Sequence, residues 1–181
     1  MENIYLVLVG FLFLLAISDL MVGVSNDAVN FLNSAIGSKV APLKIIMLIA
    51  AVGIIFGATF SSGMMEVARK GIFHPQYFYF SEIIIIFLAV MVTDVLLLDL
   101  FNTFGMPTST TVSIVFELLG AAVAVAMLKA LSSPETMGMG DYINSGKALA
   151  IIAGILLSVV IAFTVGAIVQ YIARLLFSFN Y

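Results

Sequence analysis

Long apolar runs separated by short polar segments make up most of this chain. An α-helix needs roughly 20 mainly apolar residues to cross the hydrocarbon core of a bilayer. Five stretches approach that length, at about 4–22, 43–62, 81–103, 109–131 and 147–177. These runs are continuously apolar, whereas the strands of a membrane barrel alternate between apolar and polar positions. We therefore expect an all-α membrane protein with about five transmembrane helices, the last one long enough to tilt or to extend beyond the bilayer.

The composition agrees with a membrane location. Of the 181 residues, 63% are hydrophobic and 9% are charged, whereas a soluble domain is nearer half apolar and a quarter charged. The apolar runs leave no room for a soluble domain, so residues 1–181 are expected to form a single transmembrane unit in the cell or inner membrane, in contact with membrane lipids. The net charge of −3 is spread along the chain and predicts no nucleic-acid partner.

Two connections are longer than the others, at 63–80 and 132–146. Both contain turn formers and charges, and both are expected to be aqueous loops or interfacial segments. If all five runs span the membrane, four basic residues fall on one side (Arg69, Lys70, Lys129 and Lys147) and three on the other (Lys39, Lys44 and Arg174). This balance does not decide the orientation. An odd number of spans would insert a second copy of the chain upside down, as in inverted-repeat transporters.

Several acidic residues lie in or beside the apolar runs, namely Asp19, Asp27, Asp94, Asp99 and Glu117. A charge at the bilayer centre costs roughly 2.5–3.5 kcal/mol, so each one needs a reason. Asp19 is either hydrated near the end of the first run or functional. Asp94 and Asp99 lie about 140° apart on a helix, so one is expected to line a polar cavity and the other to lie near an interface. Glu117 is either a protonated or hydrogen-bonded structural group or a transport residue.

Catalytic and transition-metal chemistry are poorly supported. The chain has no cysteine, and its single histidine, His74, lies in a predicted loop. With no clustered ligands, zinc is improbable and a packing role for His74 is favoured. The glycines of MGMGDY lack the spacing and the lysine of a phosphate-binding P-loop. We expect a protein that is not an enzyme and needs no cofactor.

Two polar segments interrupt the apolar pattern, GVSNDAVNFLNSAIGS at 23–38 and GMPTSTTVS at 105–113. Pro107 lacks an N–H group and disfavours helix at the residue before it, so a helix should stop there and restart after it. Thr108 and Ser109 are good caps for the restarting helix. In the first segment, Ser25, Asn26 and Asp27 are also N-cap residue types. The pattern predicts two half-helices that begin within or close to the membrane, as broken or re-entrant segments.

A helix N-terminus offers unpaired N–H groups and a partial positive charge, which suit an anion. Two such ends, with hydroxyl and amide side chains, could replace the hydration shell of a tetrahedral oxyanion. Asp27 would repel that anion by roughly 4 kcal/mol at 4 Å and an effective dielectric constant of 20. A co-bound sodium ion or proton removes the conflict. The alternative is that each segment is an interfacial turn, but the presence of both favours cation-coupled anion transport.

These two segments resemble signatures of the inorganic phosphate transporter (PiT) family of sodium- or proton-coupled permeases. The family signature is approximately G-A-N-D-V-A-N-A-F-G-T-A-V-G-S, and here Asn26-Asp27-Ala28-Val29-Asn30 continues to Ser34-Ala35-Ile36-Gly37-Ser38. The family's G-x-P-x-S-T-T-H corresponds to the run from Gly105 to Thr111, with Val112 in place of histidine. A weaker echo of the family pattern lies in GMMEVARKGI, at 63–72.

The resemblance implies a site for inorganic phosphate and a coupling cation. Its substrate-binding residues would be Asn26, Asn30, Ser109, Thr110 and Thr111. The cation would lie at Asp27 and Asn26, where sodium is possible, with Asp94 as a further candidate. Family members carry two inverted copies of the signature and this chain carries one, so it would supply half of a site. The second repeat would come from a missing segment or from another subunit, as in a homo-oligomer.

Other functions remain open at this level. A sulfate permease needs little change, because sulfate is also a tetrahedral oxyanion. A membrane scaffold or regulatory subunit would use the polar segments only as breaks in helix packing. An intramembrane phosphohydrolase is the least favoured, because no histidine or arginine accompanies the carboxylates within the apolar runs.

Overall fold

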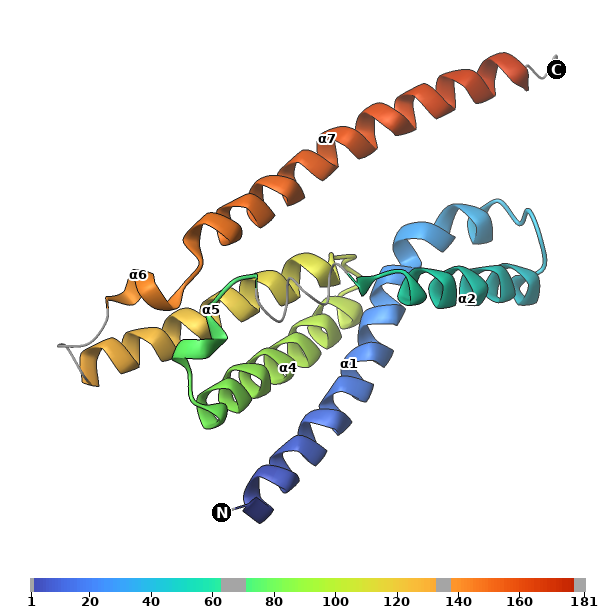
Figure 1. Ribbon diagram of the computed structural model, residues 1–181. Helices are drawn as coiled ribbons and strands as arrows, with labels where there is room; N and C mark the ends of the chain where they lie inside the picture. Colours follow the sequence, from blue (N-terminus) through green and yellow to red (C-terminus); the bar gives the residue numbers. More distant parts are fainter. Residues whose placement is uncertain (1, 63–70, 133–137, 178–181) are drawn as a thin grey trace. The chain divides into compact units, whose positions relative to one another are not determined.

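The computed structural model describes residues 2–62, 71–132 and 138–177. All of the long secondary-structure elements in these ranges are α-helices (Figure 1). Among the described residues, four helices are long and apolar enough to cross a membrane: α1 (Glu2–Gly37), α4 (Phe80–Thr103), α5 (Thr110–Ser132) and α7 (Ser145–Leu176). The remaining expected run, at 43–62, forms the shorter apolar helix α2 (Leu43–Thr59). The all-α membrane fold expected from the sequence is therefore confirmed. The short helices η1 (Pro75–Tyr77) and α6 (Met139–Tyr142) lie in the two longer connections.

The chain divides into two compact units, at 1–144 and 145–181. The second unit consists of α7, whose 32 residues span about 48 Å. Most of its apolar side chains from Leu149 to Leu176 are exposed, which suits contact with lipid. The helix is longer than the roughly 30 Å of a hydrocarbon core, as the length of the last apolar run predicted.

Helix α1 is continuous over 36 residues. The prediction that a half-helix begins at Ser25, Asn26 and Asp27 is therefore wrong. These residue types favour N-caps, but nothing in this segment forces a break as a proline would. The Ser25 hydroxyl donates to the Met21 carbonyl at 2.8 Å, inside the helix. Figure 1 shows that the ribbon bends in its second, paler half without ending. The helix runs about 54 Å along its path, well beyond the apolar run that ends near residue 22.

The second expected break is present. Helix α4 ends at Thr103 and α5 begins at Thr110, on either side of Pro107. Gly105 has a φ of +65°, a left-handed conformation that glycine adopts without strain. Its N–H donates to the Asn102 carbonyl, and the next N–H, of Met106, donates to the Phe101 carbonyl. This pair of hydrogen bonds is a Schellman motif and satisfies the last carbonyls of α4.

Helices α1, α4 and α5 pack against one another. The buried residues of α4 include Ile86, Val90, Asp94 and Leu98, which recur every fourth position and form one stripe along the helix. The buried stripe of α5 is Leu118, Ala122 and Ala126, and both alanines are fully buried. Small residues at such positions let helix backbones come close in a membrane protein. This packing fixes the faces from which the polar side chains of the three helices meet.

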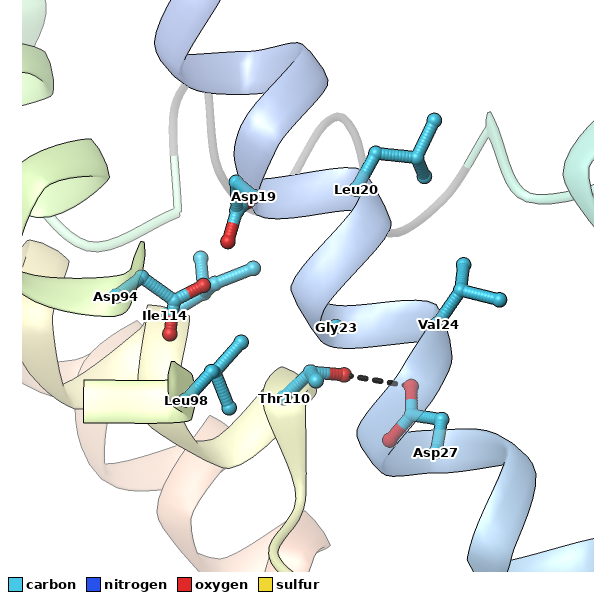
Figure 2. A pocket seen from close by; sticks show the side chains of 9 residues that line it. All are labelled: Asp19, Leu20, Gly23, Val24, Asp27, Asp94, Leu98, Thr110 and Ile114. Carbon is cyan, nitrogen blue, oxygen red and sulfur yellow. Dashed lines mark hydrogen bonds between the residues drawn. The ribbon is translucent and has the colours of Figure 1, made fainter. Parts of the chain in front are cut away.

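Gly23 lies where α1 comes close to the other two helices (Figure 2). A Cβ atom built on Gly23 would lie 3.4 Å from Thr110 Cγ2 and 3.6 Å from Leu98 Cδ1. These are ordinary van der Waals distances, so the space holds a methyl group and little more. Gly23 therefore sets how closely α1 can approach the start of α5.

We predict that Gly23→Leu lowers the free energy of unfolding by about 1–3 kcal/mol through overpacking. Gly23→Ala should be tolerated, because its methyl group fits and alanine is favoured in a helix by about 1 kcal/mol. Gly10→Leu on the same helix is the matched control, because a Cβ there has no neighbour within 4 Å. Thermal unfolding in detergent measures all three. Equal midpoints for Gly23→Leu and Gly10→Leu would contradict the close approach.

Within unit 1–144, the described parts of the two longer connections join each other at one end of α4 and α5. The Phe73 and Ile143 backbones form an isolated antiparallel bridge, with the His74 N–H donating to the Tyr142 carbonyl at 3.0 Å. The rings of Phe73, Phe78 and Tyr142 pack edge to face and are buried. The His74 ring lies 5.9 Å from the Tyr77 ring, in agreement with the predicted packing role. Arg69, Lys70 and nearly all of GMMEVARKGI lie outside the described residues.

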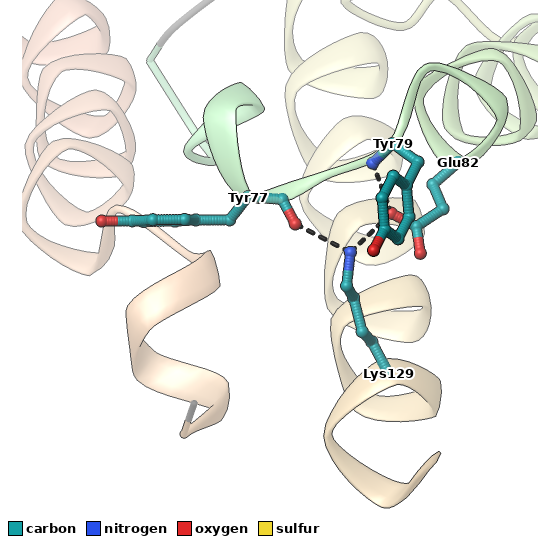
Figure 3. Close-up of polar contacts among 4 residues, drawn as sticks. All are labelled: Tyr77, Tyr79, Glu82 and Lys129. Carbon is teal, nitrogen blue, oxygen red and sulfur yellow. Dashed lines mark hydrogen bonds and ion pairs between the residues drawn. The ribbon is translucent and has the colours of Figure 1, made fainter. Parts of the chain in front are cut away.

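Lys129 of α5 forms hydrogen bonds with Glu82 at the start of α4 and with Tyr77 in the loop before it (Figure 3). Its Nζ donates at 2.8 Å to Glu82 Oε2 and at 2.8 Å to the Tyr77 carbonyl. It also lies 4.4 Å from the centre of the Tyr79 ring, a cation–π contact. The same Glu82 oxygen accepts the Tyr79 N–H at 2.7 Å and so caps α4. One ammonium group thus links α5, the start of α4 and the loop before it.

We predict that Lys129→Met lowers the free energy of unfolding by about 1–3 kcal/mol, since it removes charged hydrogen bonds from a half-buried carboxylate. Lys44→Met is the control, because Lys44 is exposed on α2. The measurement is the midpoint of thermal unfolding of the purified protein. The same shift in both variants would show that Lys129 does not link these elements.

Candidate functional site

The side chain of Asn26 joins the two polar segments that the sequence singled out. Asn26 is 2% exposed. Its Oδ1 accepts the Thr108 N–H at 2.9 Å, and its Nδ2 donates to Asn102 Oδ1 at 2.8 Å and to the Met106 carbonyl at 3.4 Å. A buried backbone group without a partner costs about 1–3 kcal/mol. Asn26 thus replaces hydrogen bonds that the segment around Pro107 cannot make within a helix.

Two further amides strengthen this junction. Asn102, in the last turn of α4, donates to the Val22 carbonyl at 3.2 Å. Asn30, one turn beyond Asn26, donates to the Thr108 carbonyl at 3.2 Å. The segment from Met106 to Thr108 is therefore held on α1 by side chains rather than by helical hydrogen bonds. This explains why the chain can stop and restart a helix here without leaving its backbone unsatisfied.

Asp27 meets the start of α5. Thr110, the first residue of α5, donates its hydroxyl to Asp27 Oδ2 at 2.9 Å. Ser109 occupies the N-cap position, where its carbonyl accepts the Ser113 N–H at 3.0 Å and its hydroxyl accepts the Val112 N–H at 3.4 Å. The first N–H groups of a helix have no acceptor within the helix. The carboxylate of Asp27 therefore lies close to a helix end that carries partial positive charge.

A cavity of about 160 Å³ lies between α1, α4 and α5 (Figure 2). At about 30 Å³ for each water in the liquid, its volume corresponds to roughly five water molecules. It is lined by Asp19, Leu20, Gly23, Val24, Asp27, Asp94, Leu98, Thr110 and Ile114. The oxygens of three carboxylates and one hydroxyl thus face a space otherwise lined by apolar groups. Such a space suits a small cation or a proton-carrying water chain.

The predicted site residues occupy different places around this cavity. Asp27, Thr110 and Asp94 line it, and Asp94 is fully buried. The side-chain amides of Asn26 and Asn30 form hydrogen bonds in the junction with 106–108. Ser109 and Thr111 are exposed at the start of α5. Of the two carboxylates of α4, Asp94 lines the cavity and Asp99 is exposed on another face. The expected position of the second carboxylate near a membrane interface stays a prediction.

Some residues of this region were not found from the sequence. Asn102 was not singled out, although it completes the junction, and Asp19 was not connected to Asp94. A helical spacing was present as a signal, because Asp19, Gly23, Asn26, Asp27 and Asn30 follow i, i+4, i+7, i+8 and i+11. That spacing is typical of one face of a continuous helix. It therefore also argued against the break that the N-cap residue types suggested.

Comparison with known proteins identifies the family. Residues 23–180 match the phosphate transporter family (PHO4). The chain belongs to this family. With its long apolar helices, it is a multi-pass integral membrane protein. The resemblance that the two polar segments suggested is thus confirmed over most of the chain.

Two similar relatives both carry the name "Putative phosphate permease". The one from Thermococcus kodakarensis is 33% identical over 104 residues, which cover 56% of this chain and 26% of the relative. The one from Helicobacter pylori strain J99 is 32% identical over 110 residues, which cover 60% of this chain and 21% of the relative. The match thus spans about a quarter of the length of these relatives. No solved structure matches the chain.

We predict that Asn26→Leu lowers the free energy of unfolding by about 1–3 kcal/mol, because the part-buried Thr108 N–H loses its acceptor. Asn33→Leu is the matched control, since Asn33 is exposed on the same helix seven positions later. Thermal unfolding in detergent compares the two variants. A midpoint that falls as little in Asn26→Leu as in the control would show that the junction contributes nothing to stability.

Proposed function

We propose that the protein transports inorganic phosphate across the membrane together with a cation, and that this chain supplies one half of the substrate site. It would act as a secondary active transporter and not as an enzyme. The family and the names of the relatives support phosphate as the substrate. The observation that carries the proposal is the contact between Thr110 and Asp27, which joins an anion-favouring helix end to a carboxylate at the edge of a cavity.

The anion is bound by the start of α5. The backbone N–H groups of Thr110 and Thr111 and the hydroxyls of Ser109 and Thr111 are donors suited to phosphate oxygens, while the Thr110 hydroxyl donates to Asp27. Ser109 and Thr111 are exposed, so their hydroxyls are available to an incoming ligand. Helix α1 runs through residues 25–27 without a break. This chain therefore supplies one helix N-terminus at the site, that of α5. The remaining donors would come from the other half.

The cation is bound at Asp27. Its carboxylate oxygen Oδ2 accepts a hydrogen bond from the Thr110 hydroxyl. Two negative charges about 4 Å apart repel by roughly 4 kcal/mol at a dielectric constant of 20. A sodium ion or a proton at Asp27 would convert that repulsion into attraction for the phosphate. Asn26 has one lone pair of Oδ1 left for such an ion, and Asp94 faces the same cavity. This dependence of one ligand on the other is the basis of coupling.

The other half of the site is an inverted repeat, contributed by a further segment or by another subunit of a homo-oligomer. Transport proceeds by alternating access, in which the two halves rock around the bound phosphate and cation. The match over about a quarter of each relative's length is consistent with one repeat of a longer assembly. The single junction between α1 and 105–110 described above is the part that this chain contributes.

We predict that Asp27→Asn lowers cation-dependent phosphate uptake at least about tenfold, a loss of about 1.4 kcal/mol or more in coupling. The amide oxygen of asparagine still accepts the Thr110 hydroxyl, so the variant should fold. The measurement is uptake of labelled phosphate by liposomes that contain the native full-length protein, with an imposed sodium or proton gradient. Asp99→Asn is the matched control, because Asp99 is exposed on α4.

Three outcomes would contradict the proposal. Unchanged uptake in Asp27→Asn would remove Asp27 from the cation site. Strong competition of labelled phosphate uptake by sulfate would favour a sulfate permease. Absence of uptake, together with absence of thermal stabilisation by phosphate plus sodium, would favour a scaffold or regulatory role.

A further inference from the structure

A group of three carboxyl groups lies beside the candidate site, one from each packed helix: Asp19 on α1, Asp94 on α4 and Glu117 on α5. Asp19 and Asp94 both line the cavity, and Glu117 lies about one turn beyond Ile114, which lines it from α5. Figure 2 shows Asp19 and Asp94 pointing into the same space. Asp94 is fully buried.

The oxygens of this cluster lack donors. Neither oxygen of Asp94 has a hydrogen-bond partner, and the same is true of Asp19 Oδ1 and Glu117 Oε2. The hydroxyl of Ser113 donates to Glu117 Oε1 at 2.8 Å. In the ranges that the structure describes, no lysine, arginine or histidine forms a salt bridge with any of the three, and the remaining carboxylate that faces the cavity is Asp27. Buried polar groups are rarely left so incompletely paired.

Three ionised carboxylates cannot share this space without a positive partner. Two ionised carboxylates about 4 Å apart repel by roughly 4 kcal/mol at an effective dielectric constant of 20. A metal ion is one solution, but in the described part of the chain no group of three or more histidine, cysteine, aspartate or glutamate side chains is arranged to hold one. A proton needs only two facing oxygens, which Asp19 and Asp94 provide. Carboxyl groups this close gain and lose protons as a unit.

We propose that Asp19, Asp94 and Glu117 form a proton-binding site, in which a proton on one carboxyl group is donated in a hydrogen bond to its neighbour. The proton comes from water in the cavity and returns to it, and the released site keeps one more negative charge. Asp27 and Thr110 line the same cavity, so that charge acts directly on the proposed phosphate and cation site. This role in coupling rests on the proposed function, whereas the proton site itself can be tested without transport.

The test is difference infrared spectroscopy of the purified full-length protein, which detects the carbonyl stretch of protonated carboxylic acids and its shift in heavy water. We expect such a band at neutral pH, lost on alkaline titration. Asp94→Asn should remove or shift it, whereas Asp99→Asn, five residues away on an exposed face, should leave it unchanged. Asp19→Asn and Glu117→Gln are the further variants if Asp94→Asn does not fold, and Asp94→Glu should restore the band.

Two results would overturn the proton site. One is the absence of a protonated-carboxyl band at neutral pH, accompanied by thermal stabilisation by sodium chloride but not choline chloride that is lost in Asp94→Asn; this would make the cluster a sodium site. The other is a band that none of the three substitutions changes. A band that behaves as expected in a protein without phosphate uptake would support the proton site while contradicting the proposed function.

Discussion

The junction between the Asn26 side chain and the segment around Pro107 is the contact on which the rest of the site depends. A proline in or near the membrane ends one helix and leaves backbone N–H and C=O groups without hydrogen-bond partners in the helix or in the lipid. The amides of Asn26 and Asn30 bind those groups, and Asn102 ties the end of α4 back to α1. Because the segment at 106–108 is held in place, Thr110 lies against Asp27 and lines one side of the cavity.

The sequence predicted the α-helical membrane class, four of the five runs to within about three residues and the break at Pro107, because each rests on a strong local cause. Proline and a long apolar run leave few alternatives. The predicted break at Ser25, Asn26 and Asp27 was wrong for the opposite reason. These residues favour an N-cap only when their side chains have no better partner, and here Asn26 and Asp27 find partners on another part of the chain.

The site itself was predicted in part. The structure brings the two polar segments into contact, and Asp27, Thr110 and Asp94 line one cavity. Their role in binding phosphate and a cation stays a prediction. The sequence could not show that Asn26 and Asn30 use their amides to hold backbone, or that Asp19 and Asp94 line one cavity. Both facts depend on which turns of α1, α4 and α5 face one another. That is a property of packing at Gly23, Ala122 and Ala126, which no local pattern encodes.

The continuity of α1 has a mechanical consequence. One hydrogen-bonded helix carries both the residues of the junction and a stretch of exposed apolar side chains that includes Leu6, Phe13 and Leu20. A broken helix could absorb a tilt of its lipid-facing half at a hinge, but a continuous one transmits it to Asp27. Bilayer thickness, which sets such tilts, thus acts on the shape of the cavity through the helix itself.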